Sequence, residues 1–279
     1  MAENISGIVY HCALNLFFTG IKEKNELLLK PLLSDNGPSL PKEYCKLLEL
    51  SVNAIFDAFP ALQTAERPQM SSLTARLLRA GKKHFQFNLE KCLANFLLFF
   101  AGCRIIGCET SYQSERDFYF LNGKLDCILK TPENKYIIVD FKTNWMPSRA
   151  VCIGGEENGL SDFQLPVYIN LAEENEKIKI FTVLFYSILK LKPEIIVGTV
   201  QDVYTEVIIP KKEEDRIMRE SERFCRIIKE VNQKAGQFAK EISTGNFTVF
   251  ETRYNECNNC QFNRICRTVY VINRERKLQ

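Results

Sequence analysis

The chain has 279 residues, of which 46% are hydrophobic and 25% are charged, and its formal net charge at pH 7 is +3. This composition predicts an ordinary globular protein with a sizeable core, and it excludes a low-complexity or wholly disordered chain. The small positive charge is compatible with nucleic-acid binding but does not require it. The sequence has no transmembrane run and no signal peptide, so we expect no membrane partner and a reducing, cytoplasmic setting for its 11 cysteines.

The spacing of apolar residues, with Pro and Gly between the spaced segments, predicts an α/β protein whose first part is helical. Helices are expected over residues 4–30, 40–59, 71–100 and 211–242, with a shorter one around Gln164 and Tyr168. Strands of a mixed sheet are expected at 104–113, 116–121, 124–130, 135–142, 179–190, 194–199 and 202–209. The expected organisation is a helical N-terminal region (1–102), a core (103–245) and a cysteine-bearing C-terminal segment (246–279) that packs with the core as one unit.

A β-hairpin in the middle of the chain carries the most informative residues. Residues 124–129 and 135–142 read as two strands joined by a Pro-containing turn, and the second strand is apolar up to Asp140. Alternate residues of a strand share a face, so Asp140 and Lys142 are expected to point to the same side. Pairing within the hairpin would bring Asp126 alongside Asp140.

Two neighbouring carboxylates repel each other unless a divalent cation lies between them, and Mg²⁺ or Mn²⁺ prefers such oxygen ligands. Asp126 and Asp140 are therefore expected to bind the metal, and Lys142 to orient a water or to stabilise developing negative charge. This set of residues indicates metal-assisted hydrolysis of a phosphodiester. The alternative is a surface hairpin with an ordinary ion pair, which the adjoining apolar run argues against.

The hairpin and a downstream helix together resemble a known family. The segments G-K-L-D at 123–126 and I-I-V-D-F-K-T at 137–143 are similar to the core motifs of the RecB-like branch of the PD-(D/E)XK nucleases. Gln164 and Tyr168 match the Q-x-x-x-Y motif of that branch, at a spacing that places both on one helix face. The resemblance implies a restriction-endonuclease-like core, a mixed central sheet flanked by helices, and activity as a Mg²⁺- or Mn²⁺-dependent deoxyribonuclease.

The same resemblance implies roles for further residues near the hairpin. The backbone carbonyl of Phe141 would complete the metal shell, while Gln164 and Tyr168 would contact the DNA or position Lys142. Glu109 falls where these nucleases often place a glutamate before the catalytic hairpin, although it also reads as a solvated strand residue.

The histidine of the family pattern is where this chain departs from it. Members of the branch usually carry a metal-binding histidine in a G-x-x-x-H helix. His84 lies in the expected region but is one residue short of that spacing from Gly81. His11 has the spacing from Gly7, but it abuts Cys12 and so precedes the expected position. His84 is thus the ligand candidate, with a solvated histidine as the alternative.

Three cysteines close to the C-terminus form a C-x2-C-x5-C pattern: Cys257, Cys260 and Cys266. Three thiolates need a fourth ligand to close a metal site, and the unpaired spacing favours an iron-sulfur cluster over zinc. The pattern resembles the 4Fe-4S staple of AddB-type nuclease domains, which implies Cys12 as the fourth ligand, with Ala13 in place of the family's proline. Cys45 is the alternative ligand.

The resemblance as a whole implies an AddB-type iron-sulfur DNA nuclease, an exonuclease on single- or double-stranded ends in recombination and repair, with a helicase or helicase-nuclease subunit as partner. One alternative is a CRISPR-associated RecB-like nuclease, whose third motif often ends in E-x-K where this chain has Asp140. Another is a non-catalytic iron-sulfur DNA-binding scaffold with a decayed site. Trp145 would either stack on a base at the mouth of the site or cover the edge of the core.

Overall fold

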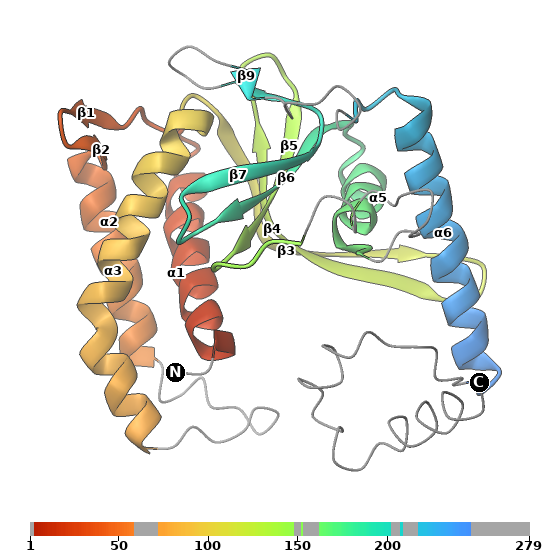
Figure 1. Ribbon diagram of the computed structural model, residues 1–279, viewed down its shortest axis with the longest axis horizontal. Coiled ribbons are helices and arrows are strands. Elements are labelled where there is room, and N and C mark those ends of the chain that lie inside the picture. The colour runs from red at the N-terminus through yellow and green to blue at the C-terminus, as the bar shows by residue number, and fades with distance from the viewer. Residues whose placement is uncertain are drawn as a thin grey trace, which may run out of the picture. The chain divides into compact units, whose positions relative to one another are not determined.

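The protein was analysed as a computed structural model, which describes residues 3–58, 72–147, 152, 162–201, 207–208 and 217–246 (Figure 1). The helices are α1 (Glu3–Glu23), α2 (Lys42–Ala58), α3 (Ser72–Phe100), α5 (Gln164–Glu176) and α6 (Glu222–Ser243). The strands are β1 (Leu32–Ser34), β2 (Gly37–Ser39), β3 (Arg104–Glu115), β4 (Phe120–Lys130), β5 (Tyr136–Lys142), β6 (Ile180–Ser187), β7 (Lys192–Val197), β8 (Val200–Gln201) and β9 (Val207–Ile208). None of the described helices is long and apolar enough to cross a membrane.

The chain divides into two compact units, Met1–Asn232 and Gln233–Gln279, and α6 begins in the first and ends in the second. The first unit contains a five-stranded sheet in the order β3-β4-β5-β6-β7. Neighbouring strands are antiparallel except β5 and β6, which run parallel. A parallel pair needs a crossover, and α5 lies in the connection from β5 to β6. The mixed sheet expected from the sequence is confirmed.

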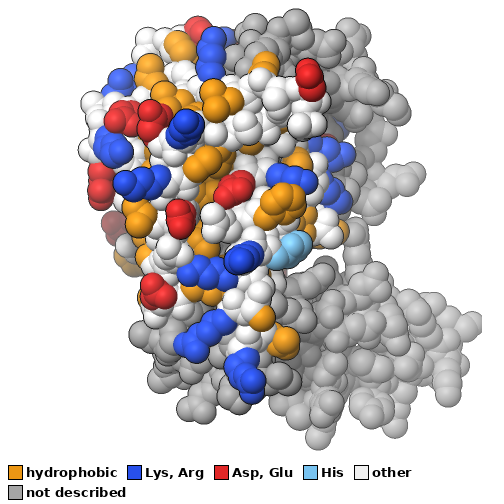
Figure 2. All heavy atoms as spheres, turned by 90° about the vertical axis from the view of Figure 1, so that its left-hand side faces the viewer, with side chains coloured by type: hydrophobic (Ala, Val, Ile, Leu, Met, Phe, Trp, Pro, Cys, Tyr) orange, Lys and Arg blue, Asp and Glu red, His pale blue; other side chains and the backbone are white. Residues whose placement is uncertain are grey.

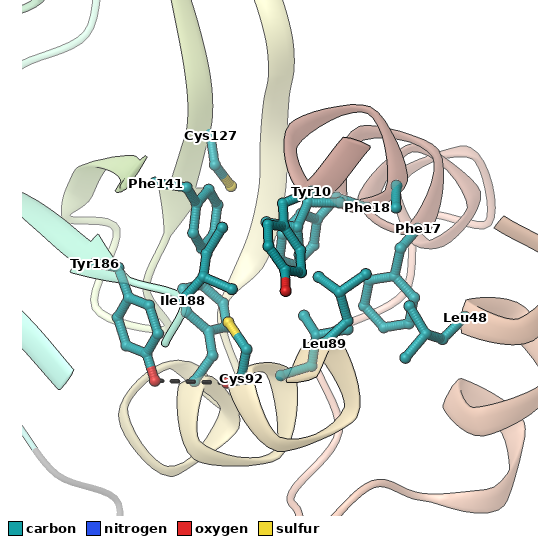
Figure 3. Packing of buried hydrophobic residues seen from close by; sticks show 14 of the residues in the cluster. Tyr10, Phe17, Phe18, Leu48, Leu89, Cys92, Cys127, Phe141, Tyr186 and Ile188 are labelled. Carbon is teal, nitrogen blue, oxygen red and sulfur yellow. Dashed lines mark hydrogen bonds between the residues drawn. The ribbon is translucent and has the colours of Figure 1, made fainter. Parts of the chain in front are cut away.

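Helices cover both faces of this sheet. On one face, Phe18 of α1 and Phe96 of α3 pack on Phe141, with ring centroids 5.7 Å and 5.6 Å from its ring. Figure 3 shows these aromatic and aliphatic side chains gathered between the two helices and the strands. On the other face, Leu165 of α5 belongs to a second buried cluster that includes Ile138 of β5. Because β5 is covered on both sides, its interior residues are buried, as its continuous apolar run predicted.

Several element boundaries differ from the sequence-based expectation. The first helix ends at Glu23 instead of continuing to residue 30, and Asn25 just beyond it has φ 56°. Of the strand expected at 116–121, residues 116–119 form the connection between β3 and β4, and the rest joins the strand expected at 124–130 in β4, because Gly123 does not interrupt its ladder with β3. The β1–β2 hairpin was not expected. Part of the helix expected over 211–242 and part of the strand expected at 202–209 fall outside the described residues.

The face formed by β1, β2, α2 and α3 is mixed in character (Figure 2). Lys and Arg side chains alternate there with Asp, Glu and apolar side chains, and among the coloured residues no single sign of charge gathers. A face of this kind has no electrostatic preference for a polyanion. The carboxylates singled out by the sequence lie elsewhere, where the β4–β5 ladder stops.

Candidate active site

Asp126 and Asp140 meet where the β4–β5 ladder stops. The last pair before the site is Cys127 with Val139, so the next residue outward on each strand is an aspartate. Asp126 Oδ2 accepts a hydrogen bond of 2.8 Å from the backbone N–H of Phe141, which fixes that carboxylate against β5. The hairpin thus brings the two carboxylates together, as its sequence predicted.

Asp140 is almost fully buried, with 1% of its surface exposed. Burial, followed by repulsion from the charge of Asp126, raises the pKa of Asp140 to about 7, and the nearby ammonium of Lys142 offsets part of this rise. Its Oδ2 lies 2.8 Å from Lys142 Nζ as an ion pair, but without hydrogen-bond geometry. Among the described residues, Asp140 Oδ2 is the one buried side-chain oxygen that lacks a hydrogen-bond partner. Such an atom is costly to bury and is suited to a cation.

A side-chain network from α5 holds Asp140 and Lys142 in place. Gln164 accepts a hydrogen bond from Lys142 Nζ at 2.8 Å and donates through Nε2 to Asp140 Oδ1 at 2.7 Å. Gln164 Nε2 also donates to the hydroxyl of Tyr168 at 2.9 Å, one turn further along the helix. The i, i+4 pair thus lies on the helix face that meets Asp140 and Lys142, and its role in positioning Lys142 stays a prediction. The Lys142 ammonium also lies 5.2 Å from the centre of the Phe185 ring.

Glu109 lies beside Asp126 at an irregularity in the β3–β4 pair. Cys108 pairs with Cys127 and Thr110 with Leu125, and Glu109 and Asp126 lie between these two pairs. Glu109 adopts φ 46°, a left-handed conformation that costs a non-glycine residue energy within a strand. Leu125 and Ile128 both join the cluster under α5, although strict alternation would place them on opposite faces. The irregularity turns Glu109 and Asp126 out of the regular pleat toward α1.

The histidine beside these carboxylates is His11 of α1. Its Nδ1 is 3.4 Å from Asp126 Oδ2 and 3.7 Å from Glu109 Oε1. Burial by itself would lower the pKa of His11, but its hydrogen bonds with Asp126 and Glu109 raise it to about 10. Gly7, one turn earlier, lets α1 approach β5 closely, because a Cβ atom there would lie 3.4 Å from Thr143 Oγ1.

The structure favours His11 over His84, the candidate chosen from the sequence, as the histidine ligand. The His84 ring nitrogen Nε2 is 3.2 Å from Asn88 Nδ2, on α3, and His84 is not among the side chains that converge on the carboxylates. The reason is tertiary: α1, although it precedes the rest of the fold, packs against the end of β5 and brings His11 to the site. The Gly7–His11 spacing was a signal in the sequence that pointed to this residue.

A metal ion fits the residues present. Ligand atoms of His11, Glu109 and Asp126 all lie within 4.8 Å of one another. Carboxylate oxygens suit Mg²⁺ and Mn²⁺, and imidazole nitrogen suits a transition metal such as Mn²⁺ better than Mg²⁺. The Oδ2 of Asp140, which is ion-paired with Lys142, is a further buried carboxylate oxygen. The carbonyl of Phe141 remains a prediction as a ligand.

A cavity of about 1100 Å³ opens in front of this group. His11, Glu109, Asp126 and Lys142 line it on the side of the sheet. Its other lining residues include residues of α1, of α3, of the segment after β5 and of the segment after β6: Ser6, Ile8, Tyr10, Cys12, Gly81, His84, Phe85, Asn88, Asn144, Trp145 and Leu189. Trp145 is 73% exposed at this cavity, which favours the mouth of the site over the core edge for its side chain.

The structure describes only some of the cysteines that are expected to bind a cluster. Cys12 is half-buried on α1 and lines the same cavity as His11. Cys45, the alternative ligand, is half-buried on α2, with its thiol 3.7 Å from the carbonyl oxygen of Leu40. Cys257, Cys260 and Cys266 lie outside the described residues.

Lys124 is a site residue whose contact the sequence did not reveal. Its ammonium forms an ion pair with Glu109, and its side chain lines the cavity. Gly123 before it allows α5 to approach, since a Cβ atom there would lie 2.6 Å from Leu171 Cδ1 and 3.2 Å from Tyr168 Cε1. The glycine of the G-K-L-D segment is thus required by the close packing of the helix that carries Gln164.

Comparison with known proteins agrees with this geometry. A search of curated proteins found no match to the chain. A family model described as the PD-(D/E)XK nuclease superfamily matches residues 2–267, which takes in nearly the whole chain from α1 onward. The matched region includes both aspartates and Lys142 of the hairpin, and its five-stranded mixed sheet flanked by helices fits the core of that superfamily. The chain belongs to the PD-(D/E)XK nuclease superfamily.

Proposed function

We propose that this protein is a metal-dependent DNA nuclease that hydrolyses phosphodiester bonds in the cavity at the end of β4 and β5. The observation that carries the proposal is the convergence of His11, Glu109 and Asp126 next to Asp140 and Lys142. Buried, mutually repelling carboxylates are unfavourable for a purely structural site, and they are explained by a cation.

Each residue has a distinct part in this proposal. His11, Glu109, Asp126 and Asp140 would hold Mg²⁺ or Mn²⁺, which would supply Lewis-acid polarisation of the phosphoryl oxygen and a more acidic bound water. Lys142, which is held by Asp140 and Gln164, presents a fixed positive charge to the phosphate as negative charge develops on it. Tyr168 limits the rotation of Gln164 through their hydrogen bond.

Cleavage of linear single- and double-stranded DNA tests the proposal directly. Wild-type protein is assayed with Mg²⁺, with Mn²⁺ and with EDTA, beside Asp140→Asn and the exposed-site control Asp35→Asn. We expect metal-dependent cleavage by the wild type and by the control, and none by Asp140→Asn at unchanged thermal stability. Equal cleavage by Asp140→Asn and the wild type would refute the site.

We further propose that the enzyme is of the RecB-like, AddB type, an exonuclease on DNA ends in recombination and repair that acts with a helicase partner in the cytoplasm. Support comes from the RecB-like motifs, including Gln164 and Tyr168, and from the cysteine pattern. The presence of His11 beside the carboxylates weakens the alternative of a decayed scaffold, because it offers a histidine at the position where the sequence seemed to lack one. Asp140 in place of glutamate still disfavours the CRISPR-associated alternative.

A 4Fe-4S cluster bound by Cys12, Cys257, Cys260 and Cys266 belongs to this proposal. It would join α1, which carries His11, to the C-terminal segment, so its loss should reduce metal binding at the active site as well as stability. Anaerobic purification followed by iron, sulfide and zinc analysis tests it. We expect iron and sulfide in equal amounts, lost in Cys260→Ser and retained in Cys225→Ser, whose cysteine is exposed on α6. Zinc in their place, or a metal-free wild type, would contradict it.

A further inference from the structure

The β3–β4 hairpin continues well past the carboxylates. Its ladder is regular from the pair Thr110–Leu125 to the pair Glu115–Phe120. From Asp126 to Phe120 the strand advances six residues, about 20 Å at roughly 3.3 Å per residue. The hairpin is therefore long enough to contact a substrate at a distance from the metal-binding side chains.

One face of this extension is covered by α5. Tyr112 donates a hydrogen bond to Glu176 at 2.7 Å, and Arg116 forms an ion pair with Glu174 at 2.7 Å. Ser114 also hydrogen-bonds to Glu174. Gly123 allows the close approach of Leu171 on this side. The side chains of the covered face thus pack the hairpin against α5.

The opposite face is open. Alternation along the regular ladder places Ser111 and Gln113 of β3 beside Lys124 and Asn122 of β4, all exposed. These side chains line a hollow of about 470 Å³. Lys124 lines both this hollow and the cavity of the active site, so the two adjoin at its side chain.

An exposed aromatic residue lies at the far end of the open face. Phe120 is 58% exposed and alternates with Asn122 and Lys124, and the neighbouring Phe118 is 57% exposed. Aromatic rings at the surface provide stacking platforms for unpaired bases, and hydroxyl, amide and ammonium groups contact the sugar and phosphate. Glu115, opposite Phe120, and the exposed Asp117 in the connection between the strands are carboxylates at this end, where contact with a base and not with a phosphate is expected.

We propose that the open face of the β3–β4 hairpin is a binding tract for single-stranded nucleic acid, with Lys124 on a phosphate next to the active site and Phe120 stacked on a base about 20 Å from the carboxylates. A base in a duplex is already stacked and does not offer its face to Phe120. The inference rests on the proposed nuclease function and adds to it a substrate class and a place where the strand runs.

The ion pair between Lys124 and Glu109 gives the tract a link to the metal site. Without a cation, the carboxylate of Glu109 forms an ion pair with the ammonium of Lys124. When Glu109 binds a divalent cation, that ammonium becomes available to a phosphate. Binding of the single strand should therefore be tighter with a divalent cation than with EDTA.

Fluorescence anisotropy of labelled oligothymidylates tests the tract without requiring cleavage. A tetramer and a dodecamer are compared in Ca²⁺, with a gel to verify that they stay intact. We expect the wild type to bind the dodecamer more tightly than the tetramer, and Phe120→Ala to bind the dodecamer roughly 5- to 100-fold more weakly, the range for loss of one stacked base. Phe87→Ala, an equally exposed phenylalanine on α3 that does not line either hollow, is the matched control.

The salt dependence of binding tests the phosphate contact separately. Lys124→Gln should lower the slope of log affinity against log salt by about 0.7, the value for one phosphate contact on a single strand. Lys91→Gln, on the exposed surface of α3, should leave the slope unchanged. A merely structural role for Lys124 would alter the affinity without altering this slope.

The possible outcomes separate this inference from the proposed function. If Phe120→Ala binds the dodecamer as tightly as the wild type does, the tract is refuted, whether or not the protein cleaves DNA in Mg²⁺. If Phe120→Ala weakens binding but wild-type protein never cleaves DNA, the tract stands and the nuclease proposal fails. Equal affinity for the dodecamer and for a blunt duplex of the same length would also refute the tract.

Discussion

The two ends of the β3–β4 hairpin differ in what surrounds them. At the base, Cys127 and Leu129 are buried in the aromatic core between the sheet and the helices α1 and α3. Toward the tip, α5 covers one face and the other is exposed, as Phe120 and Lys124 show. Glu109 and Asp126 lie at the boundary between the buried base and the exposed tip of the hairpin.

This difference separates two requirements on one pair of strands. A reactive group must be fixed in position by its surroundings, which the packed base provides. A long flexible substrate needs an accessible surface, which the tip provides. Substitutions at the base should therefore change the rate of chemistry, and those near the tip should change binding.

Lys142→Met removes the positive charge at the buried end and should lower kcat by about a hundred- to a thousand-fold, as for the loss of one preorganised electrostatic contact. The affinity for single-stranded DNA in Ca²⁺ should change little, because the contacts of the open face remain. Steady-state kinetics and anisotropy measure the two quantities. A raised KM with an unchanged kcat would show that Lys142 acts only in binding.

The histidines provide a matched pair within one cavity. His11→Gln removes a side chain that contacts Asp126 and Glu109, and should weaken Mn²⁺ binding about ten- to a hundred-fold. His84→Gln, on the opposite wall, should leave Mn²⁺ affinity unchanged. Isothermal titration with Mn²⁺ gives both values. A larger effect from His84→Gln would restore the ligand assignment that the sequence favoured.

The sequence predicted the parts of this site that depend on local pattern. The placement of Asp126, Asp140 and Lys142 follows from strand alternation and one tight hairpin, which depend on only a few consecutive bonds. Gln164 and Tyr168 were indicated by their resemblance to a family motif, and their spacing only placed them on one helix face.

The relations that sequence could not supply are tertiary. His11 reaches the site only because α1 packs against the end of β5, more than a hundred residues away along the chain. No sequence signal indicated the left-handed backbone of Glu109, because that conformation is normally adopted by glycine. The surrounding fold must offset its energetic cost. The short β1–β2 hairpin was missed because Gly37 and Pro38 are as common in plain loops.

Gly123→Ala tests the junction between the base and the tip. The added Cβ would lie 2.6 Å from Leu171, so α5 must shift or the hairpin must bend, at a cost of roughly 1–3 kcal/mol in unfolding free energy. Because α5 carries Gln164 and Tyr168, cleavage should slow as well. Chemical denaturation with a parallel cleavage assay measures both, and Gly81→Ala on α3, where the added Cβ would make only ordinary contacts of 3.6 and 3.7 Å with Phe85, is the control for replacing a glycine without a clash. Lost stability with full activity would show that the Gln164 network tolerates movement of α5.

Trp145→Ala should have the smallest effect. Its ring is largely exposed at the cavity, so its removal should cost little stability, and it should raise KM for single-stranded DNA by roughly 5- to 10-fold, near the low end for one stacked base. Trp145→Phe should restore most of this loss, because a smaller ring still stacks, and fluorescence quenching of the chain's single tryptophan by added oligonucleotide gives an independent measure. If thermal stability falls while KM is unchanged, the ring covers the core edge. The open side of the substrate path would then consist of the β3–β4 hairpin without Trp145.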